Sequence, residues 1–174
     1  ASGEGQRTKL DRAIGNLLER YEKVGKLAKP LKFKLERESE AERTLAFPGK
    51  ILADSLRRRL LISDTNHHRV LVTDLSGDVQ AVIGAGKIGF EDGSFKTAQF
   101  HQPQGLALSE DGRRLYVADT ENHAIREVDL KLKRVRTLAG NGKQAQFHDD
   151  GGVGRGAKLS SPWDLALVND KLYI

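Results

Sequence analysis

The sequence of 174 residues contains no cysteine. This absence excludes disulfides, cysteine-ligated zinc, thiol nucleophiles and Cys-x-x-Cys redox chemistry within the chain. The sequence also lacks an uninterrupted apolar run of about 18 residues, the minimum for a membrane-spanning helix. We therefore expect no redox centre and no membrane span in these residues.

Clustered basic charge is also lacking, although the chain is basic overall. Lys and Arg number 29 against 24 Asp and Glu, which gives a net charge of +5 and a pI near 9.5. This excess favours anionic partners, but no run of about five basic residues marks a nucleic-acid footprint. A solvated, mildly basic surface is the preferred interpretation, and nucleic-acid binding is the less favoured one.

The N-terminal part carries the pattern of one amphipathic helix. From Thr8 to about Ala28 the apolar residues recur every three or four positions; they are Leu10, Ile14, Leu17, Leu18, Tyr21, Val24 and Leu27. We expect this stripe to pack on the rest of the chain or on a neighbouring domain that the sequence lacks, with a membrane surface or a partner helix as the alternative.

A charged linker follows, from Lys29 to Thr44. Within it Leu31, Phe33 and Leu35 alternate with lysines and predict one short strand. We place a domain boundary here, with residues 1–44 as helix and linker and residues 45–174 as a second domain.

The second domain is organised around a repeat. Residues 60–70 and residues 115–125 are near copies, 55 residues apart. Units of this length that contain several short strands are typical of β-propeller blades.

Period-two alternation predicts four strands in each unit. The expected strands are 47–53, 60–63, 70–73 and 79–83, then 103–108, 115–118, 125–128 and 135–139, then 162–167 and 172–174. Residues 74–78 and 110–113 supply hairpin turns. The predicted fold is all-β, a partial propeller of about two and a half four-stranded blades, and we expect the chain to be a fragment of a closed ring.

The repeated turn resembles the signature of NHL repeats. The copies run from Asp64 to His68 and from Asp119 to His123, and the likeness extends over residues 45–174. One departure is Ala124, where the first copy has Arg69. The nearby Arg126 is expected to offer a substitute charge.

Further motifs resemble the family that joins a thioredoxin-like domain to an NHL propeller. They are residues 18–21, 47–50, 72–75, 119–123 and 161–164. This resemblance implies that residues 1–44 are the C-terminal end of a thioredoxin-like domain, otherwise missing here, and its linker. For plant and algal members it also implies a lumenal thylakoid role in photoprotection, restraining a slow quenching of the light-harvesting antenna. Redox chemistry would belong to cysteines that this sequence lacks.

The polar residues of the repeat are interpreted as structural. Asp64 and Asp119 follow a strand and are placed to accept backbone N–H bonds across the turn, while His68, Asn122 and His123 lock it. Catalytic acids and metal ligands are the disfavoured alternatives, because repeated positions on adjacent blades stay apart. His67 has no histidine counterpart, and we expect it to be exposed.

The mouths of the inner strands are the expected partner-binding positions, since they face the channel of a propeller. The candidates are Lys50, Gln104, Trp163 and Asp164. Only Asp164 could ligate a metal, which weakens a metal-dependent hydrolase or lyase. Trp163 is expected either to be buried under a neighbouring blade or to anchor a partner.

The predicted function is a protein-interaction scaffold, with no catalytic residue, metal or cofactor in this chain. Its expected partners include the missing thioredoxin-like domain and the remaining blades. The rival hypotheses are RNA binding, for which Lys50, Lys87, Arg113 and Arg114 are candidates, and a metal-dependent enzyme.

Overall fold

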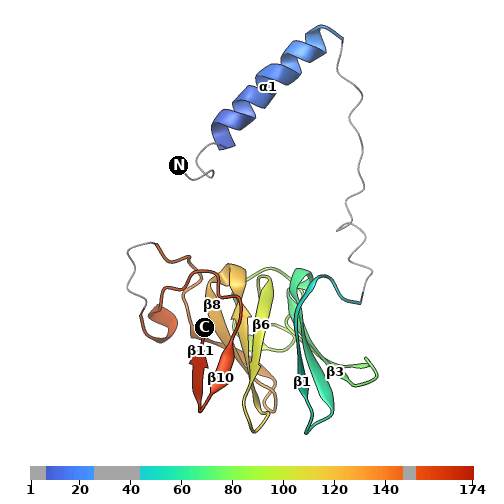
Figure 1. The fold of residues 1–174 in the computed structure, drawn as a ribbon, viewed down its shortest axis with the longest axis vertical. Coiled ribbons are helices and arrows are strands. Elements are labelled where there is room, and N and C mark those ends of the chain that lie inside the picture. Colours follow the sequence, from blue (N-terminus) through green and yellow to red (C-terminus); the bar gives the residue numbers. More distant parts are fainter. Residues whose placement is uncertain (1–6, 26–43, 147–151) are drawn as a thin grey trace. The chain divides into compact units, whose positions relative to one another are not determined.

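The computed structural model of the chain describes residues 7–25, 44–146 and 152–174 (Figure 1). The chain separates into two compact units, Ala1–Glu36 and Arg37–Ile174, which are described one at a time. The short strand predicted at Leu31, Phe33 and Leu35 lies outside the described residues. The domain boundary expected after Thr44 stays a prediction.

The first unit contains the predicted amphipathic helix, α1 (Arg7–Lys23). Its apolar side chains from Leu10 to Val24 are about half exposed or more. The helix ends at Lys23 rather than near Ala28, because Gly25 adopts a left-handed φ of 64° and donates its N–H to the carbonyl of Glu22. No helix among the described residues is long and apolar enough to cross a membrane.

The first blade is the predicted four-stranded meander. It consists of β1 (Pro48–Asp54), β2 (Arg59–Asp64), β3 (Arg69–Asp74) and β4 (Val79–Ile83), paired antiparallel in that order. Gly77 has a φ of 94° in the β3–β4 turn, as its position predicts.

The second blade repeats this arrangement with one addition. Its strands are β6 (Pro103–Leu108), β7 (Arg114–Asp119), β8 (Ala124–Asp129) and β9 (Arg134–Ala139), and β5 (Gly93–Ser94) pairs with the outer edge of β9. The sequence did not predict β5, because two residues that begin with glycine carry no alternating pattern.

The third unit is a short hairpin, β10 (Ala166–Val168) and β11 (Lys171–Tyr173). Its turn residues Asn169 and Asp170 both have positive φ, as a two-residue hairpin turn requires. The prediction of a strand from Pro162 is wrong for residues 162–165. In the two blades the equivalent proline pairs with the aspartate that ends the second strand, whereas here that partner position falls after Ile174.

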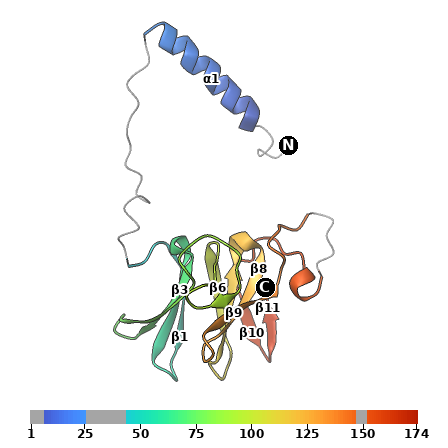
Figure 2. The ribbon, with the colours of Figure 1, turned by 180° about the vertical axis from the view of Figure 1, so that it is seen from behind.

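The described residues also form three 3₁₀ turns: η3 (Thr65–His67), η4 (Thr120–Asn122) and η5 (Gly154–Gly156). The two blades stand side by side (Figures 1 and 2). Their main core contains Leu61, Val70 and Ile83 of the first blade, Leu106, Leu115 and Val117 of the second, and Phe95 and Phe100 of the connection. A smaller cluster, Ala107, Ala118, Ile125 and Leu165, joins the second blade to the third unit.

Candidate functional site

The repeated turn has the same backbone in both copies. Each copy leaves its strand through an aspartate, makes one turn of 3₁₀ helix, and ends on a histidine in the left-handed region. The φ values are 52° at His68 and 48° at His123. Non-glycine residues adopt this conformation only where the surroundings hold them there.

The two aspartates are buried and accept a backbone N–H, but not across the turn as predicted. Asp64 Oδ1 accepts from the N–H of Ala46 at 2.7 Å, and Asp119 Oδ1 accepts from the N–H of His101 at 2.7 Å. Both donors belong to the segment that leads into the inner strand of the same blade. Each carboxylate therefore ties the start of its blade to the end of the second strand.

The second carboxylate oxygen binds an arginine in both copies. Asp64 Oδ2 accepts from Arg69 Nε at 2.8 Å, and Asp119 Oδ2 accepts from Arg126 Nη1 at 2.8 Å. The structure thus confirms that Arg126 supplies the charge missing at position 124. The predicted exposure of His67 is wrong, since its side chain is 18% exposed and its Nδ1 lies 2.8 Å from Asp64 Oδ2. Asn122, at the equivalent position, donates to Asp119 Oδ2 at 2.8 Å.

Arg126 is the largest fully buried side chain among the described residues, with a relative exposure of 0%. Besides Asp119, its guanidinium donates to the carbonyls of Gln99 and Glu91 and to Asp92 Oδ1, at 2.8, 2.7 and 3.0 Å. Burial raises the pKa of Asp119, and the arginine opposes that rise. Arg126 therefore anchors the connection between the blades as well as the turn.

Two phenylalanine rings enclose this guanidinium. Its carbon lies 5.1 Å from the centroids of both Phe90 and Phe100, within the range of cation–π attraction. Arg126 Nε is the single buried side-chain nitrogen or oxygen of the described residues without a hydrogen-bond partner. Sequence reasoning missed this enclosure, because backbone carbonyl acceptors leave no mark in a sequence.

The same turn also fastens the following unit. The hydroxyl of Thr65 donates to the carbonyl of Pro103 at 2.8 Å, and His68 Nδ1 accepts the N–H of Gln102 at 3.1 Å. In the second copy Thr120 donates to the carbonyl of Pro162 at 2.7 Å. His123 Nδ1 completes that copy by accepting the N–H of Ser161 at 3.0 Å. The threonine and histidine thus join one unit to the next, whereas the histidines were expected to lock their own turn and the threonines were given no role.

We expect the bond made by His68 to weaken in mild acid. Burial lowers the pKa of His68 below its ordinary value of 6.5, and the neighbouring His101 and His67 lower it further. The unfolded chain then binds protons first, so stability is lost as the pH falls through 6.5 toward the lower folded pKa. Protonation at Nδ1 also removes the acceptor for Gln102.

The test compares the chain with a His68→Asn variant, since asparagine tolerates the left-handed conformation and does not titrate. Between pH 7.5 and pH 5 the unmodified chain is expected to lose more unfolding free energy than the variant, by at most about 1 kcal/mol for a partly exposed hydrogen bond. Urea unfolding at both pH values measures this, and the other histidines are present in both proteins. Equal losses would contradict the assignment.

The inner-strand ends bring the predicted partner-binding residues of three units together. Lys50 Nζ lies 2.5 Å from Asp164 Oδ1. The hydroxyl of Ser63 accepts the N–H of Lys50 at 2.7 Å and donates to the carbonyl of Gln104 at 2.6 Å. Trp163 is 66% exposed, and its role as a partner anchor stays a prediction.

Glycine permits this close approach. A Cβ on Gly49 would lie 2.1 Å from Gln104 Oε1, and a Cβ on Gly105 would lie 2.5 Å from the Cα of Asp164. The Lys50 ammonium, assisted by the N–H of Leu165, holds the pKa of Asp164 below its ordinary value. The site is therefore an ionised, solvent-facing pair beside an exposed indole.

The cations proposed for RNA do not share one surface. Lys50 lies at the end of the blades where the inner strands begin, whereas Arg113 and Arg114 lie in and after the β6–β7 turn, at the opposite end. Lys87 is in the connection that follows β4. These four residues make no continuous basic face.

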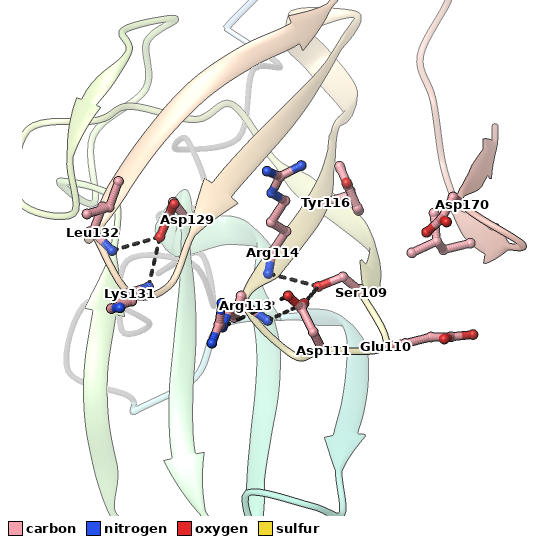
Figure 3. A pocket seen from close by; sticks show the side chains of 11 residues that line it. Ser109, Glu110, Asp111, Arg113, Arg114, Tyr116, Asp129, Lys131, Leu132 and Asp170 are labelled. Carbon is pink, nitrogen blue, oxygen red and sulfur yellow. Dashed lines mark hydrogen bonds and ion pairs between the residues drawn. The ribbon is translucent and has the colours of Figure 1, made fainter.

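A cavity of about 750 Å³ lies between the turns of the second blade and the third unit (Figure 3). Two of its four carboxylates, Asp111 and Asp129, hold their own turns. Asp111 accepts from the Ser109 hydroxyl and the N–H of Arg113. Asp129 likewise accepts the N–H groups of Lys131 and Leu132. The Ser109 hydroxyl and the Arg113 N–H lower the pKa of Asp111. These groups are not arranged as a general acid and base.

The described residues also contain no group of three or more His, Asp or Glu side chains that could hold a metal ion.

Comparisons with known proteins agree with the repeat architecture. The NHL repeat family model matches residues 100–127, which include the second copy of the turn. Protein Suppressor of Quenching 1, chloroplastic, from Arabidopsis thaliana is 46% identical over 180 residues, covering 99% of this chain and 17% of that protein. NHL repeat-containing protein 2 from Homo sapiens is 40% identical over 166 residues, covering 95% of this chain and 23% of that protein.

A crystal structure of a protein of unknown function from Bacteroides thetaiotaomicron is similar with a TM-score of 0.59 and 26% identity. The match covers 68% of this chain and 29% of that one. The chain spans about a fifth of the length of the curated relatives it matches. From its repeated turns, its blades and these relatives, the chain belongs to the NHL-repeat β-propeller proteins, and it is similar to Suppressor of Quenching over nearly all its residues.

Proposed function

We propose that this chain is the interaction scaffold of a thylakoid protein that restrains slow photoprotective quenching of the light-harvesting antenna. The observation that carries the proposal is the 46% identity to chloroplastic Suppressor of Quenching 1 across 99% of the chain, helix and linker included. In this proposal the protein is chloroplastic and acts on the lumenal side of the thylakoid. Residues 1–44 join a thioredoxin-like domain to the propeller that begins at residue 45.

The polar residues form two groups, one buried between the blades and one at the inner-strand ends, and this separation supports a scaffold. The buried polar groups of the repeated turns are used to hold blades together. Asp164 and Trp163 are exposed, and Lys50 and Gln104 are half-buried. An exposed aromatic residue flanked by charged groups is a typical anchor of protein interfaces. We propose that a protein partner of the redox domain docks here.

The test is a chimera in which this chain replaces the corresponding segment of Arabidopsis Suppressor of Quenching 1, expressed in plants that lack that protein. The chimera is expected to restore suppression of slowly relaxing chlorophyll fluorescence quenching. A Trp163→Ala chimera is expected to lose most of this restoration. A Val153→Ala chimera, altered at an exposed apolar residue elsewhere, is expected to keep it.

Other outcomes would overturn the scaffold proposal. Failure of an accumulated, folded chimera would show that the chain does not supply the function of its relative. RNA affinity that falls steeply with salt would support the nucleic-acid alternative. Hydrolytic or lyase activity abolished by a chelator would support the enzyme alternative.

A further inference from the structure

We propose that a basic groove between the first two blades binds an extended acidic polypeptide segment. We define the basic groove by the cations Arg57, Arg58, Arg59, Arg113, Lys131 and Lys133. It lies at the hairpin end of the blades, opposite the inner-strand ends, and it is independent of the function proposed above.

The groove is formed by two adjoining hollows of about 340 and 230 Å³. Both are lined by Arg57, Arg59 and Leu130, which makes them continuous. One wall is the β1–β2 turn with the outer part of the first blade. The other wall is the β6–β7 and β8–β9 turns of the second blade.

Two of these arginines, Arg57 and Arg59, already form hydrogen bonds within the chain and shape the groove. Arg59 donates to Asp54 Oδ2 at 2.9 Å and to the carbonyl of Gly112 at 2.8 Å, and Arg57 donates to the carbonyl of Asp111. Burial would raise the pKa of Asp54, but the N–H of Arg57 and the Arg59 side chain more than offset that effect. The ionised Asp54 thus positions both guanidinium groups against the second blade.

Three other cations keep their charge available. Within residues 44–146 and 152–174, no acidic side chain forms an ion pair with Arg58, Lys131 or Lys133. All three are exposed. Arg58 and Lys133 occupy left-handed positions in their turns, with φ of 51° and 55°. The loops therefore present these charges from a fixed backbone.

The carboxylates near the groove are already engaged. Asp74, which lines it, accepts the N–H groups of Ser76 and Asp78 at 2.9 and 3.0 Å. Asp111 and Asp129 accept N–H groups of their own turns, and Arg113 is 4.0 Å from Asp111. The local excess is positive, which selects an anionic partner.

The floor of the groove is apolar, with Val72, Ala81, Phe95 and Leu130 in its lining. Phe95 is its one aromatic residue among the described side chains and is only 7% exposed. Single-stranded nucleic acids rely on exposed aromatic rings to stack their bases. Aliphatic side chains interleaved with carboxylates suit this floor better than bases do.

The backbone of the groove also favours a polypeptide. Gln80 and Ala81 belong to β4, the outer strand of its sheet, and no described residue pairs with its free edge. In the second blade the equivalent edge, on β9, is covered by β5. A free edge can accept an added strand whose main chain forms hydrogen bonds and whose alternate side chains face the floor.

The test uses fluorescence anisotropy of the 174-residue chain with a labelled peptide of alternating glutamate and valine. We expect saturable binding that the triple variant Arg58→Glu, Lys131→Glu, Lys133→Glu weakens at least about tenfold. The control triple variant Lys87→Glu, Lys96→Glu, Lys143→Glu changes the net charge equally at exposed sites outside the groove. It is expected to change affinity less than about twofold, as for distant charges screened by salt. Circular dichroism verifies that each variant is folded.

Three further ligands separate the contributions of charge, of strand pairing and of the polypeptide backbone. A glutamine–valine peptide is expected to lose binding because the charge is removed. A glutamate–valine peptide with alternate N-methyl groups is expected to lose it because strand pairing is blocked. Oligouridylate of equal charge is expected to bind more weakly. Equal loss in both triple variants, retained binding of either altered peptide, tighter binding of the RNA, or no binding at all would overturn the proposal.

Discussion

Replacing Arg126 with methionine is expected to lower the free energy of unfolding by about 3–5 kcal/mol, the range for breaking a buried ion pair by removing one partner. Methionine fills much of the space between Phe90 and Phe100 but provides no donor. Asp119 would keep a buried carboxylate without its cation, and the carbonyls of Gln99 and Glu91 would lose a hydrogen bond each. These losses act on the turn and on the interblade connection together.

Urea unfolding followed by circular dichroism measures this change. The matched control is Arg136→Met, which removes the same side chain from the adjacent strand. Arg136 pairs with Glu127 at 2.8 Å and is 60% exposed, while Glu127 is 9% exposed, so we expect a smaller change of about 1–2 kcal/mol. Similar effects of the two substitutions would refute the assignment of Arg126 as a buried anchor.

A methyl group added at Gly105 is expected to cost about 1–3 kcal/mol, the usual range for overpacking. In a Gly105→Ala variant the Cβ would lie 2.5 Å from the Cα of Asp164 and 2.8 Å from the carbonyl oxygen of Trp163. Both contacts are backbone, so no side chain can rotate away. The third unit would have to move off the second blade.

Amide hydrogen exchange shows which strands lose protection. Amides of β10 and β11 are expected to exchange faster in Gly105→Ala, while those of β2 and β3 in the first blade keep their protection. Gly156→Ala is the control, since no atom lies within 4 Å of a Cβ at that position. Unchanged exchange in the hairpin, or equal loss throughout both blades, would contradict this account.

Sequence reasoning succeeded where one local pattern decides the structure. Alternation and the repeat predicted all eight main strands of the two blades, because an inward and outward side chain at every second residue is a property of the strand itself. It failed at β5 and at residues 162–165, where pairing depends on a partner strand. An edge strand of two residues and a strand end without its partner cannot be inferred from local composition.

The candidate site shows the same division. The offset of the repeat placed Lys50, Gln104 and Asp164 at equivalent strand ends, and the structure brings Lys50 and Asp164 into contact. It could not decide between the two expected positions of Trp163, nor foresee that Arg57 and Lys133, far apart in sequence, line one groove. Such neighbours are created by the packing of two blades, and neither blade alone contains that information.

The hydrogen bonds that join consecutive units use different kinds of group in the preceding unit and in the following one. The preceding unit uses side chains: a threonine hydroxyl donates and a histidine ring nitrogen accepts. The following unit contributes the carbonyl of its proline, Pro103 or Pro162, and the N–H of the residue before it, Gln102 or Ser161. The Ser161 hydroxyl also lies 3.3 Å from His123 Nδ1. The preceding unit is therefore restricted in its side chains, which must be a hydroxyl and an imidazole. The residue before the proline is restricted in its backbone instead, since Gln102 and Ser161 both have a positive φ, of 52° and 42°.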